Sequence, residues 1–385
     1  MDRVTLDGIV AEVEGYMDRD TSCLWDQEGL QSASHYCDPA WLVREQNVLR
    51  GNPVIVGHGS KIKSPGDFFT HDLTGLPILV VRQEDGSVRA MLNICTHRGT
   101  RLCTQHQGQG RNFVCPYHAW TFRIDGGLRG MPRPEGFVNV DKSQYGLKQL
   151  PCEERHGFVW VVPSPDATID VAAHLGAALD TELASYGASD LVLEREENLA
   201  AEMNWKFVLD GFLEVYHFAK LHAKSIAPYF YGNHSPFHTF GPHGRMVGVR
   251  ASFAELRGKP KDHIATDALI KHFAVNYMIF PNTVLVWQGD HFESWTAFPG
   301  ERPDRCVTHI QSITPPSMAQ PEFEGKWQRN WKILTGTVVA EDWAVSQTIQ
   351  RSAHAMPNDR IIFGRNEPGL QHFHSQLTLA ANATD

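Results

Sequence analysis

Hydrophobic and polar positions change their spacing along the chain, and these changes indicate an α+β protein. Residues 1–40 mix short helical patterns with loop residues. From Trp41 onward, short alternating or wholly apolar runs separated by Gly, Pro and Asp predict strands and turns. Beyond residue 165 the patterns are mixed. We expect helices there at 170–186 and 326–353, and strands at 191–199, 246–253, 275–296 and 306–313.

The strand-rich part contains one strong hairpin signal and a clear end. Apolar runs at 77–82 and 88–94 flank Glu84-Asp85-Gly86-Ser87, which predicts a tight turn between two strands. Phe158–Val162 predicts a last buried strand before two prolines. We therefore predict three parts: an N-terminal segment at 1–40 that packs on the C-terminal domain, an all-β domain at 41–163, and a second domain at 164–385.

Composition and charge exclude several classes of protein. Of the 385 residues, 42% are hydrophobic and 21% are charged, which is typical of a folded globular chain. The net charge of −9 argues against nucleic acid as a partner. The first residues are acidic and lack an apolar signal sequence, and no apolar run is long enough to span a bilayer, so we expect a cytoplasmic protein without membrane contact. Seven cysteines would leave one unpaired in a disulfide framework.

Two short motifs each place one Cys beside one His. They are Cys95-Thr-His97 and Cys115-Pro-Tyr-His118, with 17 residues between His97 and Cys115. A structural zinc site usually groups Cys with Cys, and it is the weaker alternative here. A [2Fe–2S] cluster of the Rieske type needs two thiolates and two imidazoles, as this order supplies. Gly126-Gly127 follows, either as amide donors to the cluster sulfurs or as a plain turn.

A second candidate metal site lies in the segment 204–222. Asp210, Glu214 and His217 recur at spacings of four and three, so they would share one face of a helix. His222 follows His217 by five residues, so the helix must loosen or end if both imidazoles are to reach one metal. Two His and one carboxylate form the facial triad of Fe(II) oxygenases, which leaves open positions for dioxygen and substrate.

The cysteine motifs resemble a known family. Cys-Thr-His-Arg-Gly followed by Cys-Pro-Tyr-His-x-Trp is similar to the signature of the Rieske non-haem iron oxygenases, in their catalytic α subunit. Thr100 and Tyr117 stand where respiratory Rieske proteins carry an additional disulfide, so the resemblance is to the ferredoxin and oxygenase branch. It implies an all-β Rieske domain, a helix-grip catalytic domain on a curved antiparallel sheet, and an O2-dependent mono- or dioxygenase.

The resemblance also implies the ligands of a mononuclear iron. The family pattern Glu/Asp-x-Tyr-His-x4-His matches at residues 214–222 and identifies His217 and His222 as imidazole ligands. A later Glu-Asp segment identifies Asp342 as the third ligand, with Glu341 as the alternative.

Three further polar residues near these ligands receive roles from the family. The acid three positions before the first His bridges to a Rieske His of a neighbouring subunit, and here it is Glu214. That position is often Asp, whereas the quaternary-ammonium monooxygenases of the family also have Glu. An inter-subunit bridge implies a homo-oligomer such as a trimer. Asp210 and Asn204 are candidates for orienting the ligands.

The partners follow from what the chain lacks. No Gly-x-Gly-x-x-Gly segment follows a predicted strand, so NAD(P)H would act only through a separate reductase, with or without a ferredoxin. The expected cofactors are the Rieske cluster and a mononuclear Fe(II), with O2 as cosubstrate.

The substrate is the least constrained expectation. Aromatic side chains suit a flat organic compound, and our candidate pocket residues are Phe207, Tyr229, Phe230, Phe240 and Trp287. We therefore expect hydroxylation or demethylation of an aromatic compound, as in aromatic hydrocarbon catabolism. The alternative is a monooxygenase of a quaternary ammonium compound of the betaine or carnitine type, and a remote one is an electron carrier with a ligand-binding domain. Arg245 and Arg250 could contact an acidic substrate.

Overall fold

The structure, a computed structural model, describes residues 1–384 and divides into two compact units. The small unit is Leu49–His174, and the large unit combines Met1–Val48 with Leu175–Asp385. The N-terminal segment thus folds with the C-terminal part of the chain. It extends to Val48 because residues that we expected to begin a strand region form a helix instead.

That helix, α2 (Pro39–Gly51), corrects the prediction that strands begin at Trp41. The Asp38 side chain accepts a hydrogen bond from the Ala40 amide at 2.8 Å and satisfies a free donor of the first turn. The buried residues recur at helical spacing, so one face packs on the large unit. They are Trp41, Leu42, Glu45, Val48 and Leu49.

The small unit consists of three antiparallel sheets. Their strand orders are β10-β5-β4-β3-β6, β11-β12-β2 and β7-β8-β9. The predicted hairpin is confirmed as β4 and β5, and Gly86 in its turn has a φ of +82°, which favours glycine. The bounds are β2 Val54–His58, β3 Asp67–His71, β4 Ile78–Arg82, β5 Val88–Leu92, β6 Gln107–Gln109, β7 Asn112–Val114, β8 Thr121–Arg123, β9 Leu128–Gly130, β10 Gln149–Leu150, β11 Cys152–Arg155, β12 Phe158–Val161 and helix α3 Val171–Leu175.

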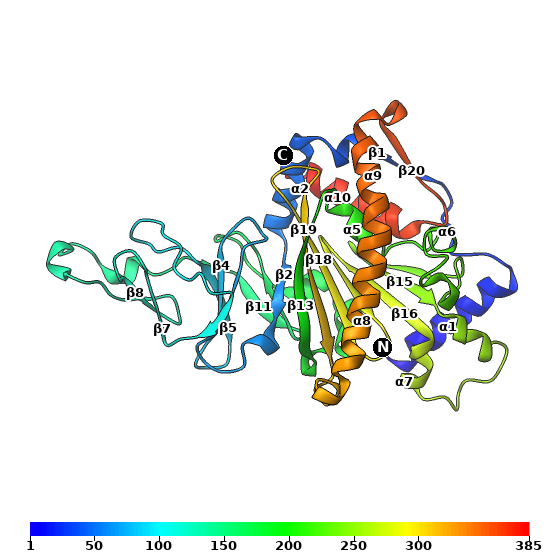
Figure 1. Cartoon of the computed structure of the whole chain (residues 1–385), viewed down its shortest axis with the longest axis horizontal. Helices are drawn as coiled ribbons and strands as arrows, with labels where there is room; N and C mark the ends of the chain where they lie inside the picture. The colour runs from blue at the N-terminus through cyan, green and yellow to red at the C-terminus, as the bar shows by residue number, and fades with distance from the viewer. Residues whose placement is uncertain (385) are drawn as a thin grey trace. The chain divides into compact units, whose positions relative to one another are not determined.

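The large unit is built on a seven-stranded antiparallel sheet of order β13-β19-β18-β17-β16-β15-β14 (Figure 1). Nearly all residues of its central strands are buried, so both faces are covered. The strands are β13 Val192–Ala201, β14 Phe237–Phe240, β15 His243–Val249, β16 Phe273–Ile279, β17 Thr283–Trp287, β18 Phe292–Pro299 and β19 Cys306–Thr314, with a separate pair formed by β1 Gly29–Ser32 and β20 Arg360–Phe363. The predicted α+β class is therefore confirmed.

A long helical segment lies across this sheet (Figure 1). It comprises α8 (Glu324–Thr337), a π-helical turn (Val338–Asp342) and α9 (Trp343–Ser352), close to the predicted 326–353. A sheet gripped by such a helix is the arrangement that the helix-grip resemblance implied. The remaining helices of the unit are α1 Arg3–Asp18, α4 Ala177–Ala184, α5 Lys206–Asp210, α6 Phe218–Leu221, α7 Thr266–Leu269 and α10 Pro368–Asn382.

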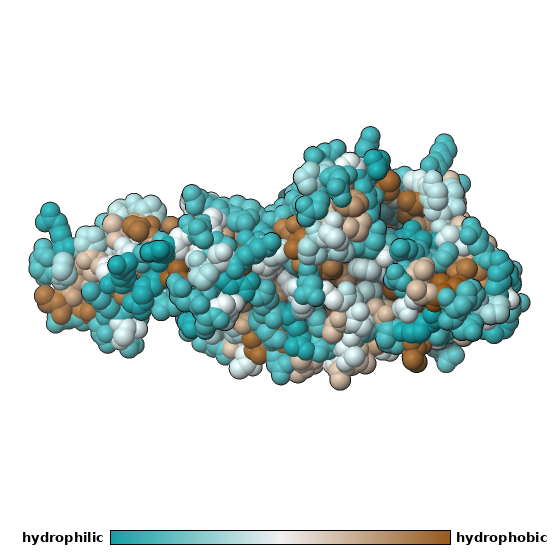
Figure 2. All heavy atoms as spheres, turned by 90° about the horizontal axis from the view of Figure 1, so that it is seen from below, coloured by the Kyte–Doolittle hydropathy of each residue, from teal (hydrophilic) through white to brown (hydrophobic). Residues whose placement is uncertain are grey.

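The surface is polar over most of the face drawn in Figure 2, with apolar residues in small separate groups. Among residues 1–384, no helix combines the length and the apolar character that crossing a membrane requires.

Candidate functional site

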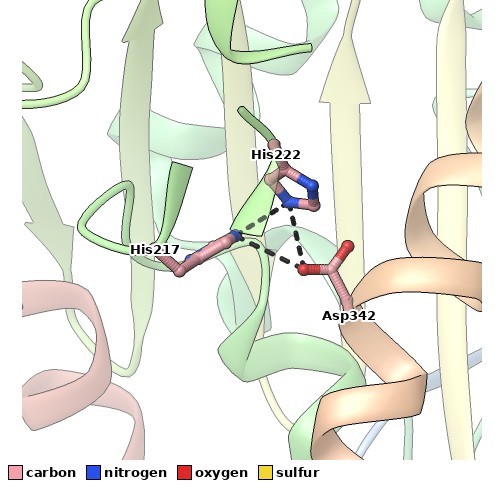
Figure 3. A group of neighbouring side chains, drawn as sticks. All are labelled: His217, His222 and Asp342. Atoms are coloured by element: carbon pink, nitrogen blue, oxygen red, sulfur yellow. Dashed lines mark hydrogen bonds and ion pairs between the residues drawn. The ribbon is translucent and has the colours of Figure 1, made fainter. Parts of the chain in front are cut away.

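Three side chains of the large unit converge as metal ligands would. Nε2 of His217 lies 3.1 Å from Nε2 of His222, and Oδ1 of Asp342 lies 3.4 Å and 3.1 Å from these two nitrogens (Figure 3). Ligand atoms about 2.1 Å from one metal and at right angles to each other are about 3 Å apart. The triangle therefore fits one face of a coordination sphere, as two His and one carboxylate do in a facial triad.

Each of the two imidazoles is held from its other nitrogen by a glutamate. Nδ1 of His217 is hydrogen-bonded to Oε1 of Glu214. The other carboxylate oxygen of Glu214, Oε2, accepts a hydrogen bond from the His217 backbone N–H at 3.2 Å. Nδ1 of His222 lies 2.7 Å from Glu341 Oε2, and the Ser225 hydroxyl donates to the same oxygen at 2.8 Å. A carboxylate on Nδ1 fixes the tautomer that leaves Nε2 free to bind a metal.

The chain around the histidines departs from the single helix that we expected. Helix α5 ends at Asp210, so Asp210, Glu214 and His217 do not share one helical face. Glu214 lies in the loop between α5 and α6, and its side chain accepts from the backbone amides of Tyr216 and His217. The short helix α6 separates His217, which precedes it, from His222, which follows it. We expected the helix to loosen or to end if both rings are to meet, and the structure shows that it ends.

The π-helical turn places the two acids of the C-terminal helix. It occupies Val338–Asp342, so the extra residue in the turn changes which side chains face the sheet. Asp342 Oδ1 points at the histidines (Figure 3). Glu341 instead accepts a hydrogen bond from Nδ1 of His222. The geometry thus separates the two acids: Asp342 completes the triangle and Glu341 orients a ligand.

The charges of the site stabilise one another. Burial alone would lower the pKa of His222, but hydrogen bonds to Asp342 and Glu341 raise it above the usual value. Burial would raise the pKa of Glu341, and the bonds from His222 and Ser225 lower it instead. The cluster of carboxylates therefore favours positive charge at this point, which is what a bound cation supplies.

Asp210 and Asn204 bond elsewhere. The Asp210 carboxylate lies 2.9 Å from Nε2 of His374 and accepts from the Tyr36 hydroxyl at 3.2 Å. Asn204 donates from its backbone to Gln350 Oε1 at 2.9 Å and accepts from Lys206 Nζ at 2.7 Å. Their hydrogen bonds thus tie α5 to α9, α10 and the N-terminal segment rather than orienting the metal-ligand side chains directly.

The four Cys and His residues of the small unit form two like pairs. The buried thiols of Cys95 and Cys115 are within hydrogen-bonding reach of each other, and the rings of His97 and His118 have centroids 4.8 Å apart. Burial raises the pKa of the Cys95 thiol, Cys115 adds to the shift, and backbone N–H groups of the loop oppose it. Thiol beside thiol and imidazole beside imidazole is the donor arrangement that a cluster with two unlike irons needs.

The two ligand loops have the same backbone hydrogen bonds. The Cys95 amide donates to Thr100 O at 2.8 Å, and the Cys115 amide donates to Trp120 O at 2.8 Å. The indole of Trp120 stacks on His97, with centroids 4.8 Å apart. Gly126-Gly127 is a plain turn, because its two amides donate to Arg123 O and Asp125 Oδ1 and are not free for cluster sulfurs.

The candidate pocket residues do not form one group. Phe230 lies near the metal-ligand triangle, because its ring is 5.8 Å from Phe218, which contacts both His217 and His222. The other four are distributed over the unit. Phe207 stacks on Tyr36, Phe240 lies under Arg245, Trp287 packs on Tyr186 and Phe292, and Tyr229 is 66% exposed.

Sequence reasoning missed Ser225 and the network around the buried Lys206. The only sequence signal for the Lys206 network is the charged side chain of Lys206 within an otherwise apolar segment. Its Nζ donates to Glu45 Oε1 at 2.6 Å and to the His35 carbonyl at 2.9 Å, and both Lys206 and Glu45 are fully buried.

Comparison with known families assigns both units. A model of the Rieske [2Fe-2S] domain matches residues 52–151, and a model of the ring hydroxylating alpha subunit (catalytic domain) matches residues 188–379. Together they match most of the chain and imply a Rieske cluster in the first region and a mononuclear iron in the second.

Curated relatives share about a third of the aligned residues. The glycine betaine monooxygenase oxygenase subunit of Chromohalobacter salexigens is 35% identical over 187 residues, which cover 47% of this chain and 40% of the relative. The carnitine monooxygenase oxygenase subunit of Escherichia coli (strain K12) is 34% identical over 181 residues, covering 46% and 48%. The benzene 1,2-dioxygenase subunit alpha of Pseudomonas putida is 32% identical, covering 45% and 39%. The aligned part of the chain thus spans less than half the length of each of these relatives.

Solved structures share the fold over nearly the whole chain. The quaternary ammonium Rieske monooxygenase CntA in complex with L-carnitine has a TM-score of 0.76 at 20% identity, covering 95% of this chain and 97% of that one. Naphthalene 1,2-dioxygenase from Rhodococcus sp. has a TM-score of 0.73 at 17% identity, covering 98% of both. From the two family models, the paired donors and the shared fold, we conclude that the chain belongs to the α subunits of the Rieske non-haem iron oxygenases.

Proposed function

We propose that this protein is the terminal oxygenase of a multicomponent system that oxidises a quaternary ammonium compound with O2. The observation that carries the oxygenase function is the triangle of His217, His222 and Asp342, whose atoms meet as ligands of one metal. Cys95, Cys115, His97 and His118 would hold the Rieske cluster. When bound, the cluster supplies single electrons and the iron supplies the position where dioxygen is activated.

The protein's own residues prepare the site. Glu214 and Glu341 hold the two imidazoles in the tautomer that presents Nε2. Phe218 packs against both rings at centroid distances of 5.0 Å and 5.2 Å, which limits their rotation and shields them from water. The sites of dioxygen and substrate would lie on the side of the triangle away from these contacts.

Two features favour a quaternary ammonium substrate over the aromatic compound that we first expected. The relatives include oxygenase subunits of glycine betaine and carnitine monooxygenases, and Glu214 stands where the resemblance to quaternary-ammonium monooxygenases also places Glu. The aromatic side chains of Phe218 and Phe230 lie near the triangle, and aromatic rings of this kind attract cations. An aromatic substrate stays the second candidate, since a benzene 1,2-dioxygenase subunit is also among the relatives.

The partners in this proposal are a reductase, with or without a ferredoxin, and further copies of the chain. A trimer in which Glu214 bridges to a Rieske His of the neighbouring subunit is part of the same proposal. A cytoplasmic location agrees with the absence of disulfides among the seven cysteines.

Iron and acid-labile sulfide analysis of the anaerobically purified protein tests the cofactor content. We expect about three irons and two sulfides per chain, from one [2Fe–2S] cluster and one mononuclear iron. His222→Ala should lose about one iron and keep the visible spectrum of the cluster. About two irons in both proteins after full loading would contradict the oxygenase proposal and support an electron carrier.

Product analysis tests the substrate. With a reductase, NADH and O2, we expect glycine betaine or carnitine to be consumed in proportion to O2 and NADH, with release of an amine and an aldehyde in equal amounts. Consumption of aromatic compounds, with the quaternary ammonium compounds unchanged, would replace the proposed substrate by the second candidate. His222→Ala is the matched control, because it removes the mononuclear site alone.

A further inference from the structure

The two arginines that the sequence offered for an acidic substrate lie on different sides of the sheet. Arg245, in the middle of β15, is buried and bonds Glu182 at 2.6 Å, so its charge is already paired. Its neighbour Met246 points to the other face, where it packs with Phe237 and Val215. Arg250 follows the end of β15 and has the same parity as Met246, so it lies on the face that contains Phe218.

A short path of ring contacts joins Arg250 to the metal-ligand triangle. Its guanidinium lies over the ring of Phe230, 5.1 Å from the centroid. Phe230 in turn packs edge to face on Phe218, whose ring touches His217 and His222. Two aromatic rings therefore separate the guanidinium from the proposed iron ligands.

The Arg250 side chain is held in place by hydrogen bonds and not by a direct ion pair, and the carboxylates of Glu293 and Asp290 act on its charge from a greater distance. Its Nη2 donates to Gln288 Oε1 at 2.7 Å, and Gln288 Nε2 donates to Glu293 Oε1 at 3.0 Å. The Arg250 backbone N–H donates to the His272 carbonyl at 2.9 Å. Within residues 1–384, Arg250 forms no ion pair, and its Nε and Nη1 have no hydrogen-bond acceptor. A largely buried guanidinium of this kind is stabilised when an anion accepts hydrogen bonds from its unused Nε and Nη1 groups.

We propose that Arg250 binds the carboxylate of the substrate, at the end of the molecule away from the iron ligands. The inference rests on the proposed function and narrows it to zwitterionic compounds that carry both a quaternary nitrogen and a carboxylate. Glycine betaine and carnitine are such compounds. The planar fork of an arginine matches the two oxygens of a carboxylate, and Gln288 positions that fork by occupying Nη2.

The inference is tested by measuring ligand binding to the intact, iron-loaded protein with anaerobic calorimetry. The probes are glycine betaine, carnitine, choline as a trimethylammonium compound without a carboxylate, and benzoate as a carboxylate without a quaternary nitrogen. The variants are Arg250→Gln and Arg250→Lys. Arg257→Gln is the matched control, because it removes the same formal charge. Arg257 is exposed and pairs with Asp18, and neither residue takes part in the contacts of Arg250 described above.

We expect Arg250→Gln to weaken binding of the zwitterionic probes roughly 10- to 100-fold, as loss of a charged hydrogen-bond pair does. Arg250→Lys keeps the positive charge but lacks the planar guanidinium, so its loss of affinity for the zwitterionic probes should be smaller. If Arg250→Gln does not fold, the comparison is made with Arg250→Lys alone. Choline should bind all variants equally, and Arg257→Gln should behave as the unsubstituted protein.

The outcomes separate this inference from the proposed function. Equal binding of zwitterions by the unsubstituted protein and both Arg250 variants would overturn the role of Arg250 and leave the quaternary ammonium substrate in place. Binding of benzoate but of no quaternary ammonium compound, lost in Arg250→Gln, would support the anion site and overturn the proposed substrate. Failure of the unsubstituted protein to bind any carboxylate would overturn the inference.

Discussion

Glu341 shows what a motif can and cannot specify at the scale of one residue. The Glu-Asp segment identified two neighbouring acids, and residue type alone left both as possible metal ligands. The structure gives the two acids different roles. Glu341 accepts a hydrogen bond from Nδ1 of His222, whereas Oδ1 of Asp342 lies beside Nε2 of the same ring. The motif residues could be predicted because they are local in sequence. Ser225 could not, because its bond to Glu341 joins segments more than 100 residues apart.

Removing the Glu341 carboxylate should weaken metal binding. Glu341→Ala leaves Nδ1 of His222 without its partner, so we expect iron affinity to fall about 10- to 100-fold, as for other groups that orient a ligand. Glu341→Gln keeps an oxygen for the Nδ1 proton and should lose less. Anaerobic Fe(II) titration of the apo-protein measures both, with the exposed Glu322→Gln as control. Unchanged affinity in Glu341→Ala would contradict the orienting role.

At the scale of the element, prediction worked where hydrophobic spacing decides and failed where tertiary contacts decide. The β4–β5 hairpin and the helical segment at 324–352 were predictable, because apolar residues recur there at a regular period. Helix α2 was missed because its buried face includes Glu45, a polar residue that periodicity does not count as core. The π-helical turn at Val338–Asp342 has no signal in the pattern, since it depends on how the helix packs.

Removing one partner of the buried Glu45–Lys206 pair should strongly destabilise the large unit. Both side chains are fully buried, and Glu45 also accepts from the indoles of Trp41 and Trp205. Glu45→Gln leaves a buried ammonium without its counter-charge, and we expect the free energy of unfolding to fall by about 3–5 kcal/mol. Urea denaturation followed by tryptophan fluorescence measures this change. The exposed pair Arg195–Glu197 provides the control, and Glu197→Gln should unfold at the same urea concentration as the unsubstituted protein.

The turn between β17 and β18 should make stability depend on pH. Burial alone would lower the pKa of His291, but the hydrogen bond to Asp290 and the nearby Glu293 carboxylate raise it above the usual value near 6.5. A raised folded-state pKa gives a stabilisation that is complete below the unfolded value and is lost as the pH rises through the folded one. The urea midpoint should therefore decrease from pH 6 to pH 9 by more in the unsubstituted protein than in His291→Gln. Identical slopes in the two proteins would show that His291 does not contribute.

At the scale of the whole molecule, the sequence predicted two metal centres in two folded units, and it also predicted more than one chain. The motifs lie in different units: Cys95 and Cys115 in the small one, His217 and His222 in the large one. Only the bounds of the units required the structure, because residues 1–48 join the large unit through contacts distant in sequence, such as that between Glu45 and Lys206. Electron transfer between chains stays a prediction that rests on Glu214.

A mixing experiment distinguishes transfer between chains from transfer within one. Cys115→Ser removes a cluster ligand, His222→Ala removes an iron ligand, and each variant alone should be inactive. When the two are unfolded, mixed and reassembled in equal amounts, an intact cluster and an intact iron meet only across a subunit boundary. About a quarter of the boundaries in randomly mixed rings should then be competent, so we expect about a quarter of the unsubstituted activity. Substrate-dependent O2 consumption measures it, and the unsubstituted protein taken through the same reassembly sets the scale. Activity no higher than that of the separate variants, in rings shown by mass spectrometry to be mixed, would mean that each cluster serves the iron of its own chain.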